Sequence, residues 1–96
     1  MTLTAPAFTS PAPNSRGNNP PYVTGRGHPY SAVTIWETNT NATLGTAICN
    51  VNGDFATTLD LTQASHQNSG AVLVIGGICT TPTDSSGYAT DLMFYL

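Results

Sequence analysis

The sequence predicts an all-β fold, an antiparallel β-sandwich of about seven strands, on three observations. Short segments rich in Thr, Val, Ile and Tyr recur along the chain, and Gly, Pro, Asn and Asp separate them. No segment has the apolar periodicity of a convincing helix. The length of 96 residues suits one domain with one modest core. Many short strands separated by turn residues are typical of a sandwich.

Residues 1–22 are expected to form an extended arm or an edge strand, and residues 23–96 the sandwich itself. The prolines of the first segment exclude a helix, because proline fixes φ and lacks an amide donor. The stretch "LTAPAFTS" can still pair at a sheet edge, with Leu3 or Phe8 turned inward. The prolines concerned are Pro6, Pro11, Pro13, Pro20 and Pro21.

The stretch "SAVTIWET", residues 31–38, is the clearest strand, because its side chains alternate between two faces. Val33 and Ile35 share the face that is expected to enter the core. Trp36 then lies on the opposite face and points away from the core.

The stretch "GRGHP" precedes this strand and is expected to turn the chain from one sheet to the other. Gly25 and Gly27 allow the backbone to bend where a Cβ would clash, and Pro29 directs the chain into the strand. A phosphate cradle would need a strand, a loop and a helix in order, so the turn is the favoured interpretation.

The rest of the chain is expected to hold a hairpin and two further strands. Residues 44–51 and 55–61 flank Asn52-Gly53, a dipeptide that favours a tight primed turn between paired strands. The later segments are a loop over 62–70, a long strand over 71–80 with a bulge at its Gly-Gly, a turn over 81–90 that contains Asp84 and Gly87, and a last strand over 91–96.

Three stretches, "PPYVTGRGHPYSAVTIW", "LGTAICNVNGDFATTLDL" and "TDSSGYAT", carry a family resemblance. Their order is similar to that of the bacterial immunoglobulin-like (Big) domains found in adhesins and phage virion proteins. That family typically reads Pro-x-x-G-T-G-x-P-G-A-x-V-x-V, then G-x-A-x-x-x-x-D-G-x-W, then T-D-x-x-G-N-x-S. Tyr30-Ser31, Phe55 and Tyr88 depart from this pattern. The resemblance implies an immunoglobulin-like sandwich, and its motifs are structural.

The charge of the chain argues against a nucleic-acid partner. Charged residues make up 7% of the sequence, with two Arg, no Lys and a net charge of −3, so no basic surface for nucleic acid is expected.

No apolar run approaches the roughly 20 residues of a membrane-spanning helix. The first ten residues hold no signal peptide pattern, so a chain that starts naturally at Met1 would not be exported by the usual route.

No catalytic, cofactor-binding or metal-binding residue is predicted. Cys49 and Cys79 are interpreted as buried thiols, with a disulfide as the second interpretation. The acids do not form a pair expected to converge in a cleft. Ser65-His66 is interpreted as part of a polar loop rather than as a catalytic dyad. We therefore expect neither an enzyme nor a cofactor.

The sequence does predict an apolar patch on one outer face of the sandwich. The last two strands are expected to be neighbours, and both carry apolar residues at positions of either parity. An antiparallel sheet with one wet face should alternate, so apolar residues on both faces suggest a covering element or a partner. The residues expected on this surface are Trp36, Leu73, Ile75, Met93 and Tyr95.

Two classes of function follow from this surface. The first is a non-catalytic structural or attachment module, foremost a phage capsid decoration or head-surface protein, with a repeat of a bacterial surface adhesin as its alternative. Its partners would be a capsid or other virion subunit, a neighbouring domain or another copy, at the virion surface or the bacterial cell surface. The second is a carbohydrate-binding module in which Trp36, Tyr30 or Tyr22 stacks on a surface glycan.

Overall fold

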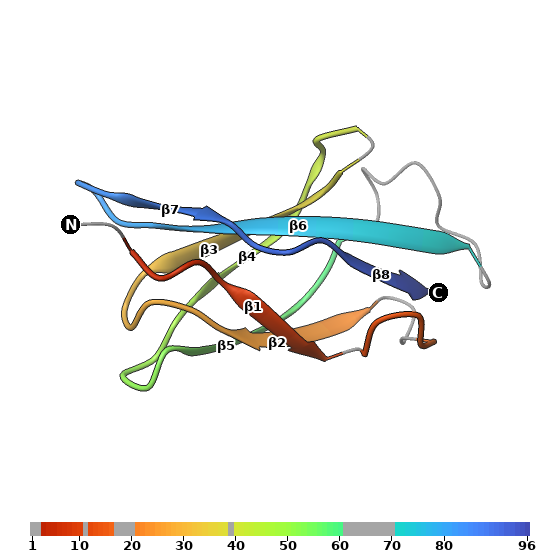
Figure 1. The fold of residues 1–96 in the computed structure, drawn as a ribbon, viewed down its shortest axis with the longest axis horizontal. Helices are drawn as coiled ribbons and strands as arrows, with labels where there is room; N and C mark the ends of the chain where they lie inside the picture. Colours follow the sequence, from red (N-terminus) through yellow and green to blue (C-terminus); the bar gives the residue numbers. More distant parts are fainter. Residues whose placement is uncertain (1–2, 11, 17–20, 39, 61–70) are drawn as a thin grey trace.

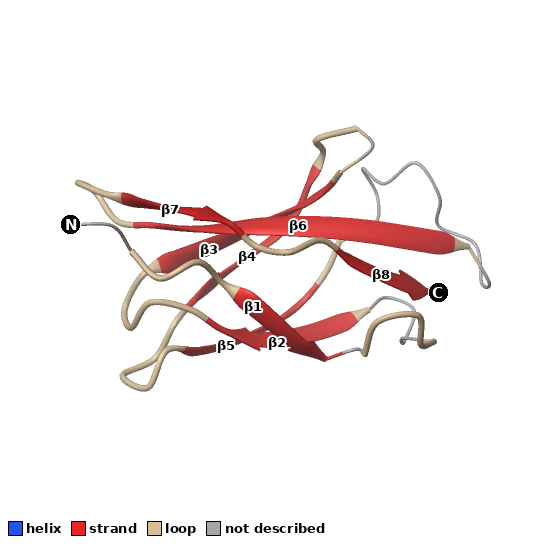
Figure 2. Cartoon of the chain, in the orientation of Figure 1, coloured by secondary structure: helices blue, strands red, loops and turns tan. Residues whose placement is uncertain are grey.

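Two antiparallel sheets pack face to face in the computed structural model, which describes residues 3–10, 12–16, 21–38, 40–60 and 71–96 (Figures 1 and 2). These residues contain no helix, and hence none that could span a membrane. The predicted loop over 62–70, with Ser65-His66, lies outside them. The strands are β1 (Ala7–Ser10), β2 (Tyr22–Arg26), β3 (Ala32–Glu37), β4 (Thr43–Ile48), β5 (Asp54–Thr58), β6 (Val72–Thr80), β7 (Ser85–Tyr88) and β8 (Leu92–Tyr95). The prediction of an all-β antiparallel sandwich is confirmed, with eight strands.

One sheet has three strands in the order β1-β2-β5, and the other has five. In the five-stranded sheet the order is β4-β3-β6-β7, and β8 also pairs with β6. The long strand β6 takes β8 along Val72–Ile75 and β7 farther on, at Ile78 and Thr80. Both edges of β6 are therefore paired, and so are both edges of β3.

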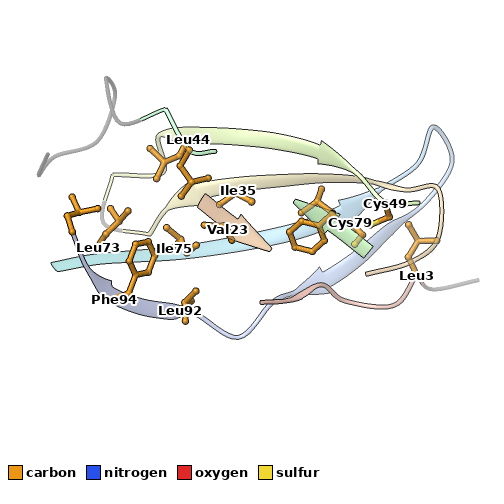
Figure 3. Packing of buried hydrophobic residues seen from close by; sticks show 14 residues of the cluster. Leu3, Val23, Ile35, Leu44, Cys49, Leu73, Ile75, Cys79, Leu92 and Phe94 are labelled. Carbon is orange, nitrogen blue, oxygen red and sulfur yellow. The ribbon is translucent and has the colours of Figure 1, made fainter. Parts of the chain in front are cut away.

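The core lies between the two sheets and is built from side chains of alternate residues (Figure 3). Val33 and Ile35 are fully buried, as predicted, and so are Phe94 and Leu96 of the last strand segment. On the three-stranded sheet, Phe8, Gly25 and Phe55 are direct neighbours across β1, β2 and β5.

The predicted hairpin between residues 44–51 and 55–61 is wrong, because β4 and β5 belong to different sheets. The turn itself forms: the Gly53 amide donates to the Asn50 carbonyl at 2.9 Å, and the Asn50 side chain accepts from two later amides. Gly53 has a φ of 86°, whereas Asn52 does not enter the positive region, so the turn is not the primed type. The local turn chemistry is compatible with a sheet crossing as well as with a hairpin.

Three other turn assignments also change. Gly25 lies within β2 and Gly87 within β7, so neither is a turn residue. The turn after β6 runs from Thr81 to Asp84, whose backbone amide and carbonyl both bond to Thr81. Pro29 does lie in the turn where the chain crosses from the three-stranded to the five-stranded sheet.

The described part of the N-terminal segment packs against the chain's own sheets. Leu3 is buried in the core and forms a β-bridge with Ser86 of β7, and β1 pairs with β2. Farther along, the Asn14 amide donates to the Met93 carbonyl, and the Tyr95 amide donates to the Ser15 carbonyl. Burial of apolar side chains holds these residues against the sandwich, and β1 is the edge strand of the three-stranded sheet.

Candidate functional site

The outer face of the five-stranded sheet, the face turned away from the three-stranded sheet, carries the apolar side chains that the core leaves out. Met93 and Tyr95 are more than one-third exposed, and Trp36 is half-buried. The outer face of the three-stranded sheet is polar by contrast, with Thr9 bonded to Thr24. The apolar outer-face residues are Trp36, Val72, Val74, Ile78, Tyr88, Met93 and Tyr95.

Leu73 and Ile75, which the sequence predicts on this surface, are instead fully buried. The reason is their pairing: Leu73 lies opposite Phe94 and Ile75 opposite Leu92, and both partners face the core. Val72 and Val74 take the outward positions in their place. The expected Gly-Gly bulge, which would reverse this parity, is absent from the regular register between β3 and β6.

Trp36 and Tyr88 form the walls of an open groove of about 680 Å³ on this outer face. Their ring centroids are 5.7 Å apart and the ring planes meet at 89°, an edge-to-face pair. Gly76 of β6 lies directly opposite Trp36 of β3. A Cβ built on Gly76 would lie 3.0 Å from the indole Nε1. The absence of a side chain at Gly76 thus leaves room for the indole.

The polar rim of the groove comes from two loops. Asn41 lies in the loop after β3 with a φ of 59°, and its amide donates to the Glu37 carbonyl at 2.8 Å. Glu37 is itself buried and accepts a hydrogen bond from the Thr40 hydroxyl at 2.8 Å. This buried carboxylate thereby fixes the loop that presents Asn41. Asp91 lines the groove from the loop before β8.

The other two aromatics considered for sugar stacking lie elsewhere. Tyr30 is 70% exposed in the turn before β3, and Tyr22 lies on β2 in the other sheet. Neither lines the groove. Trp36 is thus the one predicted aromatic that the structure places there, and it joins Tyr88, which the sequence reasoning treated as a departure from a turn motif. The pairing of Tyr88 with Ile78 across two strands could not be found from local pattern.

Cys49 and Cys79 are buried free cysteines next to Gly27. A Cβ built on Gly27 would lie 2.6 Å from the Cys79 Sγ and 3.3 Å from the Cys49 Sγ, so both thiols face the same point. Burial is the main cause that raises the pKa of Cys49, while the hydrogen bond from the Ser31 hydroxyl opposes the rise. Among the described residues, no cluster of His, Cys, Asp and Glu could hold a metal ion.

Comparison with known proteins gives a structural similarity only. No protein-family model matches the sequence, and no curated protein matches it significantly. A solved structure of a biofilm associated protein, its BSP domain, is similar to 97% of this chain with a TM-score of 0.69 and 20% identity. The chain spans 14% of that structure's length. The similarity confirms the immunoglobulin-like class of the sandwich.

Proposed function

We propose that this chain is a non-catalytic attachment module of a bacterial surface protein, of the adhesin type. The observation that carries the proposal is the similarity of nearly the whole chain to one domain of a biofilm associated protein, in which it matches only a small fraction of the length. A module of this kind acts by presenting a surface rather than by chemistry. Bacterial cell-surface or extracellular localisation follows from the same proposal.

The shape of the sandwich supports a role as a serial module. The molecule measures 40 × 23 × 18 Å, and the chain starts near one end of the long axis and stops near the other (Figure 1). A domain with this geometry can be joined head to tail into an extended array without turning the chain back. The outer face of the five-stranded sheet is then free along the side of such an array.

A structural role in a phage virion is the first expectation from the sequence, and it rests on sequence features alone. The adhesin role has the structural similarity in its favour as well. A protein partner at the outer face of the five-stranded sheet fits either role, because an exposed apolar patch on a sheet face is typical of an interaction surface.

Co-sedimentation tests the proposal. The purified chain is mixed at micromolar concentration with intact biofilm-forming bacteria and, separately, with empty phage capsids, and the bound fraction is measured in each pellet. We expect saturable binding to the cells or their matrix. Binding to capsids alone would contradict the adhesin role and support a structural role in a phage virion. Absence of saturable binding to either particle would overturn the attachment role.

A further inference from the structure

We propose that the groove between Trp36 and Tyr88 binds a pyranose ring of an uncharged polysaccharide. The inference rests on the proposed function, since it names the chemistry by which the module would attach. It is carried by the shape of the aromatic pair, the glycine floor, the polar rim and the absence of cationic side chains among the described residues that line the groove.

The aromatic pair offers a corner that matches the shape of a sugar ring. A pyranose has a C–H face that packs on an aromatic ring and a rim of hydroxyl groups that needs hydrogen-bonding partners. Trp36 and Tyr88 meet at 89°, so a ring that stacks on one of them presents its edge to the other. Tyr88 is 76% exposed, so a face of its ring is available to a ligand.

The floor of the groove is closed to a peptide strand. It is formed by β3 and β6, and each of these strands is already paired on both sides. Addition of a further strand needs an unpaired sheet edge, so a ligand of this groove must be recognised by side chains. The volume of about 680 Å³ lies within the roughly 300–1,000 Å³ of small-ligand sites.

The groove holds unused hydrogen-bonding groups of both kinds. The Trp36 indole N–H has no acceptor within the described chain, and it is not sealed from solvent. The side chains of Asn41 and Asp91 likewise make no hydrogen bond to any described residue. Together they supply an N–H donor, an amide that donates and accepts, and a carboxylate acceptor, the set that adjacent hydroxyl groups require.

The charge of the groove favours a neutral ligand. The chain has two arginines, and neither lines the groove, so phosphate and acidic sugars find no counter-charge. Asp91 and the two rings also suit an ammonium group, so the titration below includes one. A ligand with an apolar face and a hydroxyl rim uses every group that lines the site.

Intrinsic fluorescence can test the inference directly, because Trp36 is the only tryptophan in the sequence. The full chain is titrated with neutral hexose and N-acetylhexosamine oligosaccharides of several linkages, and separately with tetramethylammonium chloride. We expect a saturable change in emission with at least one oligosaccharide. No response to any of them, or a response to tetramethylammonium alone, would overturn the proposal.

Two variants and one control locate the binding. Tyr88→Ala should weaken the oligosaccharide affinity at least tenfold, and Gly76→Ser should do the same, because its new side chain displaces the indole. Tyr30→Ala removes an equally exposed tyrosine outside the groove and should bind like the parent chain. Melting curves check that all three variants fold. Unchanged affinity in folded Tyr88→Ala and Gly76→Ser would contradict the assignment.

Failure of this inference can be told from failure of the attachment role. If cells bind the chain and a saturating oligosaccharide does not displace it, the sugar site is wrong while attachment stands. If an oligosaccharide binds in the fluorescence titration and cells do not bind the chain, the sugar site stands and the attachment role falls.

Discussion

At the scale of single residues, a missing side chain decides how two aromatic rings pack. Phe8 and Phe55 flank Gly25 across the three-stranded sheet, and their rings meet edge to face with centroids 6.2 Å apart. A Cβ on Gly25 would lie 2.5 Å from both the Ala7 carbonyl oxygen and the Phe55 ring. Gly25 therefore makes room for the ring pair, rather than bending the chain as its sequence context suggests.

This close packing predicts different outcomes for two glycines in strands. Gly25→Ala should lower the free energy of unfolding by about 1–3 kcal/mol, because the added methyl group overpacks the core. Gly87→Ala is the matched control, since a Cβ there meets nothing within 4 Å. Urea unfolding of both variants measures the difference. Equal stabilities of the two variants would show that the ring pair can move aside without cost.

The buried thiol of Cys49 predicts a loss of stability in alkaline solution. Its pKa is raised in the folded chain above the ordinary value of 9.0, mainly by burial. The folded state thus keeps a proton that the unfolded state releases, and the stabilisation, fully present below about pH 9, is lost as pH rises through the folded pKa. Melting temperatures between pH 7.5 and 10.5 should fall more steeply for the parent chain than for Cys49→Ala. Parallel slopes would contradict the prediction.

At the scale of elements, β6 shows where sequence pattern stops being informative. Its residues Val72 to Ile75 are all apolar, so the strand has no alternation from which to assign its faces. The pairing of Leu73 with Phe94 decides the faces, and that pairing joins segments far apart in the chain. In β3 the alternation is present, and the inward positions of Val33 and Ile35 are predicted correctly.

Two neighbouring residues of β6 test this assignment. Leu73→Ala should cost about 2–5 kcal/mol, because it leaves a cavity among fully buried side chains. Val72→Ala, one position earlier on the outer face, should change the stability by no more than about 0.5 kcal/mol. Chemical denaturation of the pair provides the measurement. The reverse order of the two costs would restore the strand faces expected from the sequence.

The assignment of strands to sheets is also beyond local pattern. Asn52-Gly53 indicates a turn, and a turn forms, but the turn does not say whether its two strands pair with each other. Here β4 pairs with β3 and β5 pairs with β2. The sequence places the segment that forms β7 in a turn, because Gly is depleted in strands and Ser and Gly are typical turn residues. The groove could not be predicted from the sequence for the same reason, because Tyr88 contacts Trp36 only through the pairing of β6 with β7.

At the scale of the whole molecule, the N-terminal segment joins the two sheets. It contacts the five-stranded sheet at Leu3, continues as an edge strand of the three-stranded sheet, and returns to β8 at Asn14 and Ser15. The side chain of Leu3 is buried in the core, and the half-buried side chain of Phe8 packs against it.

Removal of residues 1–16 should therefore destabilise the whole sandwich rather than trim an appendage. The loss of one buried and one half-buried side chain costs about 2–4 kcal/mol in total, which corresponds to a fall in melting temperature of at least about 8 °C. The deletion also exposes the edge of β2, so the truncated chain should self-associate more strongly than the parent chain. Calorimetry and size-exclusion light scattering measure the two effects, and Pro13→Ala, an exposed change within the segment, is the control. A truncated chain that melts within a few degrees of the parent would mean that the layers hold without this segment, and that it is free to reach a neighbouring molecule.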